Sequence, residues 1–239
     1  MRRAAVTAVL ESRYDIHRIS NLTRIDNGDW NTIFRVRAED EWIVRLSHNR
    51  KRQAQLEFEL RLMSSLALRL SYVPQIKRTK DGRLYTDHQG RFCSVFQCMP
   101  GDEIPETADA VAAVGRTLGR MHNELLAYSR DHRLVDDLSL IDFDWFSNYF
   151  YTGDTLTPEW LDLVVDDDEA CYLDEIREGL LYLRNARDRL SAWIAEQQRD
   201  ELLTECTVHG DFYQRNILWD GQSVTGVIDW DETVTSWLE

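Results

Sequence analysis

The sequence is short of positive charge and of cysteine, and each shortage excludes a class of protein. Lys and Arg total 28 against 42 Asp and Glu, which gives a formal net charge of -14. Nucleic-acid binding needs a basic surface that releases phosphate counterions, so no nucleic-acid partner is expected. Cysteine is scarce, and its four positions form neither a CxxC pair nor a zinc-type cluster: Cys93, Cys98, Cys171 and Cys206. Free thiols in a reducing cytosol are the simpler interpretation.

Long apolar runs are also lacking. No stretch approaches the roughly 20 apolar residues that a membrane-spanning helix needs, so no membrane partner is expected. Residues 4–10 after Arg2-Arg3 faintly resemble a signal peptide, but the run ends at Glu11 without a convincing cleavage site. The sequence therefore predicts a cytoplasmic protein. Its 43% hydrophobic content is enough for a sizeable core.

The most informative stretch lies near the C-terminal end and reads His209-Gly210-Asp211, then Asn216-Ile217-Leu218, then Val227-Ile228-Asp229. An acid stands five positions before an asparagine, and a second acid follows a short apolar strand. Phosphoryl transfer needs a carboxylate near the acceptor hydroxyl and oxygen ligands for magnesium. Asp211 fits the first role, and Asn216 and Asp229 fit the second. The alternative is a hairpin with chance polar residues.

These residues resemble the signature of the aminoglycoside phosphotransferase and choline kinase superfamily, which includes homoserine-kinase-like relatives. The resemblance implies a two-lobed, protein-kinase-like α+β fold that uses ATP and Mg²⁺. Its N-lobe would be a small antiparallel sheet with one helix, over residues 1–99. A mainly helical C-lobe would follow over residues 100–239, shortened at its C-terminal end relative to the family. A partner copy in a homodimer could cover the apolar surface left there.

The N-terminal third is predicted to be an antiparallel meander after a helix at 4–14, with strands at 22–25, 32–36 and 42–46. The first turn carries only Gly28, not the G-x-G-x-x-G of protein kinases. The resemblance implies that the backbone from Gly28 to Asn31 lies over the ATP phosphates, whereas a plain turn explains it equally. In the third strand, Arg45 faces away from Val44 and Leu46. The resemblance makes Arg45 the phosphate-binding cation where most members have lysine; the alternative is a surface arginine.

A helix is predicted from about Gln53 to Leu70, with Glu59 at the edge of its apolar stripe. Glu59 is therefore the expected partner of Arg45, and a solvated glutamate is the alternative. A strand is predicted to begin at Val73–Ile76, and strands at 83–86 and 91–96 follow. The pattern breaks at Gln97 to Gly101, and the resemblance implies that the backbone from Gln97 to Met99 meets the adenine ring.

The C-terminal part is predicted to begin with a helix that is capped by Thr107 or Asp109 and runs to about Tyr128. Its apolar face is expected to consist of Val111, Val114, Leu118, Met121, His122 and Leu125. Gly115 and Gly119 are expected to allow close helix packing. Residues 139–174 mix aromatic and acidic side chains, which suit a cationic co-substrate. A packed insertion with an acidic rim explains them as well. Another helix is predicted from Glu175 to Gln198.

The leading hypothesis is an ATP-dependent kinase that acts on the hydroxyl of a small molecule, which the resemblance narrows to an aminoglycoside, an amino alcohol such as choline or homoserine, or a sugar. One alternative is an inactive nucleotide-binding remnant, suggested by Arg45 and the glycine-poor loop. Another is a protein Ser/Thr kinase, which the absence of an activation segment after Asp229 disfavours. The sequence does not identify the acceptor.

Overall fold

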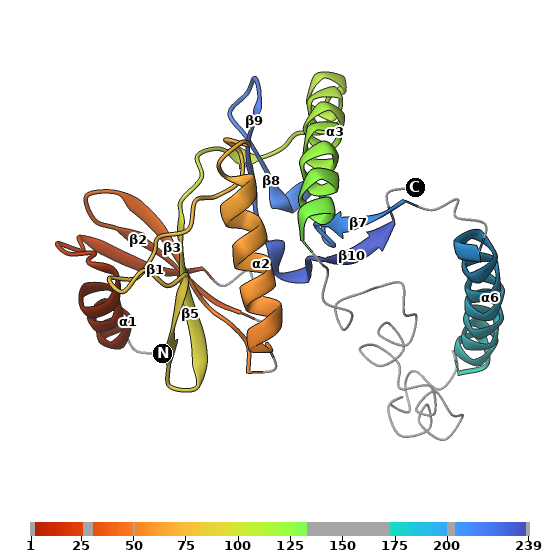
Figure 1. Ribbon diagram of the computed structural model, residues 1–239, viewed down its shortest axis with the longest axis horizontal. Coiled ribbons are helices and arrows are strands. Elements are labelled where there is room, and N and C mark those ends of the chain that lie inside the picture. Colours follow the sequence, from red (N-terminus) through yellow and green to blue (C-terminus); the bar gives the residue numbers. More distant parts are fainter. Residues whose placement is uncertain (1–2, 26–30, 50, 133–172, 200–203, 238–239) are drawn as a thin grey trace. The chain divides into compact units, whose positions relative to one another are not determined.

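The computed structural model describes residues 3–25, 31–49, 51–132, 173–199 and 204–237 (Figure 1). The chain divides into two compact units. The first comprises Met1–His132 with His209–Thr233, and the second comprises Arg133–Val208 with Val234–Glu239. This division does not test the predicted lobe boundary after residue 99, which stays a prediction. Among the helices that the structure describes, none combines the length and apolar character needed to cross a bilayer.

The first unit is built on a five-stranded antiparallel sheet with strand order β1-β2-β3-β5-β4. Its strands are β1 (Asn21–Ile25), β2 (Thr32–Arg37), β3 (Glu41–Leu46), β4 (Tyr85–His88) and β5 (Arg91–Gln97). The predicted meander is therefore confirmed. The predicted strand at Val73–Ile76 is wrong, because in the described chain this segment makes only a single bridge between Ile76 and Phe96. Its Val73-Pro74 sequence lacks the donor that a continuous ladder requires at proline.

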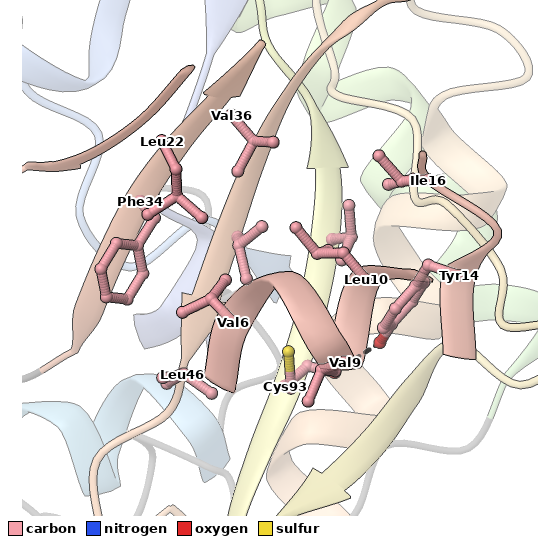
Figure 2. Close-up of a cluster of buried hydrophobic side chains, with 12 residues drawn as sticks. Val6, Val9, Leu10, Tyr14, Ile16, Leu22, Phe34, Val36, Leu46 and Cys93 are labelled. Atoms are coloured by element: carbon pink, nitrogen blue, oxygen red, sulfur yellow. Dashed lines mark hydrogen bonds between the residues drawn. The ribbon is translucent and has the colours of Figure 1, made fainter. Parts of the chain in front are cut away.

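One face of this sheet is closed by the N-terminal helix (Figure 2). The helix is α1 (Arg3–Val9), which continues as a π-helical turn (Leu10–Tyr14), so the predicted helix at 4–14 is not uniformly α-helical. Val6 and Leu10 are buried against Phe34, Val36 and Leu46 of the sheet. The Tyr14 hydroxyl donates to the Cys93 carbonyl at 2.6 Å and fixes the end of the helix.

The opposite face of β3 carries Arg45, since side chains alternate along a strand. Helix α2 (Gln53–Leu66) supplies the side chains that Arg45 meets. This helix ends four residues before the predicted Leu70, and Leu70 itself is buried in the turn that follows. Seven of its residues are buried: Leu56, Phe58, Glu59, Leu60, Leu62, Met63 and Leu66.

A second, three-stranded sheet with order β6-β8-β9 holds the C-terminal stretch. Its strands are β6 (Asp102–Glu103), β8 (Ile217–Trp219) and β9 (Val224–Val227). The sequence did not predict β6, which is two residues long and too short to show a period. Gly101 before it has φ 113°, and a Cβ there would lie 2.6 Å from Thr225 Oγ1. Glycine is therefore required where the chain enters this sheet.

Helix α3 (Ala108–Asp131) is capped by Thr107, whose side chain accepts from the Ala110 amide. The predicted apolar face is partly wrong, because Val111 is 65% exposed. Met121 and Leu125 are buried as predicted, together with Tyr128. In the first half of the helix the buried residues are Ala110, Ala113 and Thr117, each one position before a predicted residue. Gly115 and Gly119 lie off this buried face, with no described atom within 4 Å of a Cβ added there, so their predicted role in close packing is wrong.

The described part of the second unit contains helix α6 (Leu173–Arg199) and two antiparallel strands, β7 (Glu205–Val208) and β10 (Val234–Trp237). The helix matches the predicted one within two residues at its start and one at its end. The strand at 234–237 was not predicted. Residues 139–172 of the aromatic and acidic segment lie outside the described residues.

Candidate active site

Gly210 sets the backbone of the loop that carries Asp211. Its φ is +84°, and a Cβ added there would lie 2.0 Å from the Glu232 carbonyl oxygen. Two segments thus approach each other more closely than any side chain allows. The loop can take this path only with glycine at 210.

Replacing Gly210 with alanine should lower the free energy of unfolding by about 2–5 kcal/mol, as the sum of a left-handed backbone cost and an overpacking cost. The matched control is Gly221→Ala, whose φ is +97° but whose added Cβ would meet nothing within 4 Å. That control should lose only the backbone cost of about 1–2 kcal/mol. Chemical denaturation of both variants checks the difference, and equal losses would contradict the steric account.

His209 is a buried, neutral support for the same loop. The Asp211 amide donates to His209 Nδ1 at 3.3 Å, and His209 Nε2 lies 3.1 Å from the Ile228 carbonyl. An acceptor at Nδ1 and a donor at Nε2 define one neutral tautomer. Burial lowers the pKa of His209 to about 4, with the Ile228 hydrogen bond opposing the shift. The ring also packs against the Trp230 ring, with centroids 4.5 Å apart. His209 therefore links the segments before Asp211 and around Asp229 without carrying charge.

This burial predicts a pH dependence of stability. The unfolded state binds a proton at His209 near pH 6.5, whereas the folded state resists it until about pH 4. Stability is therefore fully present above pH 6.5 and should fall by about 3 kcal/mol as the pH drops to 4. Denaturation of wild type and His209→Gln at several pH values checks this. An unchanged slope between pH 6.5 and 4 in the variant would contradict it.

The predicted base and one predicted metal ligand are joined by hydrogen bonds. Asn216 Nδ2 donates to both the backbone oxygen and Oδ2 of Asp211, each at 2.9 Å. Asn216 is buried, and its own backbone carbonyl accepts from the Ile228 amide at 2.9 Å. Within the described chain, the Asn216 amide oxygen accepts no hydrogen bond, so it remains available to a cation.

Asp229, the other predicted metal ligand, has a left-handed backbone with φ 63° and ψ 64°. A non-glycine residue there stores strain, which is common where function requires one side-chain direction. The carboxylate is open to solvent yet recessed among protein atoms. Desolvation raises the pKa of Asp229, and the negative charges of Asp231 and Asp211 raise it further against the opposing effect of Arg45. A bound divalent cation would relieve this repulsion.

The donor set fits magnesium held jointly with a nucleotide. In the described residues no three His, Cys, Asp or Glu side chains converge as a metal cluster. Magnesium does not need one, since it commonly takes one or two protein oxygens and completes its shell with phosphates and water. Asn216 and Asp229 offer one amide and one carboxylate oxygen.

Arg45 and Glu59 form the buried ion pair that strand alternation and the helix stripe predict. Arg45 NH2 lies 2.5 Å from Glu59 Oε1, with the two side chains 6% and 1% exposed. Burial alone would lower the pKa of Arg45, but Glu59 and Asp231 together raise it. Burial raises the pKa of Glu59, and Arg45 and Lys51 oppose that rise. Arg45 Nε is buried and has no hydrogen-bond partner in the part of the chain that is described.

Two further members of this cluster were missed by sequence reasoning. Lys51 Nζ lies 2.7 Å from Asp231 Oδ1 and 3.2 Å from Glu59 Oε2. Asp231 Oδ1 also lies 3.5 Å from Arg45 NH1. These cations hold the pKa of Asp231 well below its usual range although desolvation opposes them. A hint was present in the sequence: Lys51 follows β3 closely, and Asp231 stands two residues from Asp229.

The other residues predicted to contact the nucleotide differ in whether their polar groups already form hydrogen bonds. Gly28 lies outside the described residues. Asn31 Nδ2 donates to Asp231 Oδ2 at 3.0 Å, and its Oδ1 accepts from the His48 amide at 3.0 Å. The backbone amide of Gln97 donates to the backbone carbonyl of Gln75, and the backbone amide of Cys98 donates to the backbone carbonyl of Glu41. Among the described hydrogen bonds, the Met99 amide makes none, which leaves it for a ligand.

The chain belongs to the phosphotransferase enzyme family, whose model matches residues 21–239. It is similar to the homoserine kinase of Zymomonas mobilis subsp. mobilis, with 25% identity over 226 residues that cover 94% of this chain and 63% of that protein. It is also similar to the homoserine kinase of Bradyrhizobium sp. (strain BTAi1), with 28% identity over 221 residues that cover 90% and 59% of the two chains. This chain thus spans about 60% of the length of these relatives.

Solved structures share the fold. A microcompartment-associated aminopropanol kinase aligns with a TM-score of 0.65 at 20% identity, covering 99% of this chain and 71% of that one. An amicoumacin kinase in complex with AMP-PNP, Ca²⁺ and Ami aligns with a TM-score of 0.63 at 16% identity, covering 99% and 66%. These likenesses confirm the kinase-like α+β fold that the sequence signature implies.

Proposed function

We propose that the protein transfers the γ-phosphate of ATP to a hydroxyl group of a small molecule. The observation that carries this proposal is the Asp211–Asn216 pair, since one loop holds a carboxylate and an amide against each other at 2.9 Å. Asp211 would orient the acceptor hydroxyl and take its proton. The pair lies in the same compact unit as Asp229, Arg45 and Glu59.

The nucleotide would be held from two directions. Arg45, positioned by Glu59, would bind the phosphates. Asn216 and Asp229 would hold Mg²⁺, which neutralises charge on the transferring phosphoryl group when bound. The amide of Met99 is the free donor for adenine beside Gln97, and the Gly28 to Asn31 backbone would cover the phosphates.

An amino alcohol is the preferred acceptor class. Both homoserine kinases and the aminopropanol kinase are named for amino alcohols, whereas the amicoumacin kinase is named for a different substrate. The net charge of -14 would also favour a substrate that carries an ammonium group. We further propose a cytoplasmic location, which is supported by the absence of a disulfide at the described cysteines, Cys93, Cys98 and Cys206. A homodimer remains a proposal that sedimentation would test.

An ATP-consumption screen of the purified chain tests the function. Homoserine, choline, aminopropanol, aminoglycosides and sugars should be compared with and without Mg²⁺, beside a longer form if the gene continues. Turnover with one acceptor class, abolished by chelator, is expected. Nucleotide binding without turnover on any acceptor, in both lengths, would favour the inactive remnant instead.

A further inference from the structure

A cavity of about 370 Å³ in the first unit lies among residues to which the proposed chemistry assigns no role. It is formed where the segment after α2, helix α3 and the turn between β8 and β9 meet. Three arginines from two segments line it: Arg69, Arg116 and Arg120. The other polar side chains in its wall come from Ser71, Tyr72, Thr117, Gln222 and Ser223. None of the described residues that line it is an Asp or a Glu.

Such a composition is unexpected in this chain, where acidic residues outnumber basic ones by 42 to 28. Arg116 and Arg120 stand four residues apart, so they project from the same side of α3. Within the described residues, neither has a carboxylate at ion-pair distance. Arg69 is partly neutralised, because its NH1 lies 3.0 Å from Glu124 Oε2. As far as the structure describes the chain, these two guanidinium groups therefore form no ion pair beside the cavity.

The wall of the cavity is fixed by hydrogen bonds rather than by loose loops. The buried Tyr72 donates its hydroxyl to the Thr117 carbonyl at 3.2 Å, which ties the segment after α2 to α3. The Val227 amide donates to the Tyr72 carbonyl at 2.7 Å, which ties the same segment to β9. In the turn between β8 and β9, the amides of Gln222 and Ser223 donate to Asp220 Oδ1 at 2.9 and 2.8 Å. The carboxylate of Asp220 is therefore already engaged within its own turn.

We propose that this cavity is a binding site for a small oxyanion, meaning a molecule with a phosphate or carboxylate group. Guanidinium groups match both anions with paired N–H donors. The hydroxyls of Ser71 and Thr117 and the side-chain amide of Gln222 line the same wall and can supply further donors. The cavity borders an element that also carries the proposed metal ligands. The hairpin whose turn borders the cavity is flanked by Asn216 at one end and Asp229 at the other, and α2 carries Glu59. A bound anion would contact the turn of this hairpin and the segment that follows α2, although any effect on turnover rests on the proposed function.

Isothermal titration at fixed ionic strength tests the site, with pyrophosphate and citrate as probes in the absence of divalent cations. Arg116→Ala/Arg120→Ala should bind at least about tenfold more weakly than wild type, because hydrogen bonds to charged groups are lost. The control is Arg130→Ala, which removes an exposed arginine from α3 outside the cavity. It should bind like wild type. Arg120→Gln keeps the test available if the double variant does not fold.

The outcomes separate the explanations. Binding of pyrophosphate alone identifies a phosphate site, and binding of citrate alone identifies a carboxylate site. Binding that survives in the cavity variants would lie in the nucleotide site and would overturn the proposal. Equal weakening in Arg130→Ala would indicate general electrostatic attraction and would also overturn it, as would the absence of binding by either probe. None of these readouts depends on turnover, so the proposal and the proposed function can fail separately.

Discussion

Asp211→Asn should lower turnover by about 10²–10⁴-fold while leaving nucleotide affinity within a small factor of wild type. An asparagine oxygen can still accept from Asn216 Nδ2, so the 2.9 Å contact and the loop should survive. What the variant loses is the ability to accept the proton of the acceptor hydroxyl. The effect should therefore appear in kcat rather than in the binding of ATP.

The measurement is steady-state turnover with the acceptor that the screen identifies, beside direct titration of a non-hydrolysable nucleotide. Asp102→Asn is the matched control, because Asp102 is exposed and lies on β6. This strand belongs to the three-stranded sheet whose strand β8 follows the Asp211 loop. This control should retain both activities. Turnover that is unaffected by Asp211→Asn would refute the assigned role of this carboxylate.

Asp231→Asn should lower the free energy of unfolding by about 3–5 kcal/mol, because it leaves two buried cations without their shared partner. Arg45 and Lys51 are 6% and 5% exposed, so water cannot replace the carboxylate efficiently. Among the described residues, Glu59 would be the carboxylate left at ion-pair distance from both cations. Asp40→Asn, at an exposed position, should change stability by less than about 0.5 kcal/mol.

A double-mutant cycle identifies the cause of that loss. Lys51→Met removes one buried charge and keeps the length of the side chain, so the double variant Asp231→Asn/Lys51→Met should be less destabilised than the sum of the two single variants. Strict additivity would show that Asp231 stabilises the fold by some route other than its contact with Lys51. Nucleotide affinity measured on the same proteins separates this structural role from ligand binding.

The pattern of residues within short stretches of sequence was sufficient to predict several parts of the structure. The meander is readable because three alternating runs are separated by polar turns, and the same alternation places Arg45 opposite Val44 and Leu46. Glu59 could be selected because one residue at the edge of a helical stripe must face the sheet. The first two parts of the family signature lie close together in the sequence. The contact between Asp211 and Asn216 therefore forms within six residues and needs no distant partner.

Other parts of the structure could not be predicted from the sequence, because they depend on residues that are far apart along the chain. Asp231 meets Lys51 across 180 residues and Asn31 across 200. The first half of α3 buries Ala110, Ala113 and Thr117 rather than Val111, because the side that is buried depends on the elements that the helix meets. β6 exists only because β8 offers it a partner.

The sequence by itself determined the family, the strand and helix alternation of the first unit, and the local chemistry of His209 to Asn216. These features depend on interactions between residues a few positions apart, so they can be predicted from the sequence. Only the tertiary structure decided that Asp231 is a buried anion bound by Asn31, Arg45 and Lys51, and that three arginines border a cavity. The physical reason is that burial and charge pairing depend on which segments meet in space, and periodicity along one segment carries no information about that.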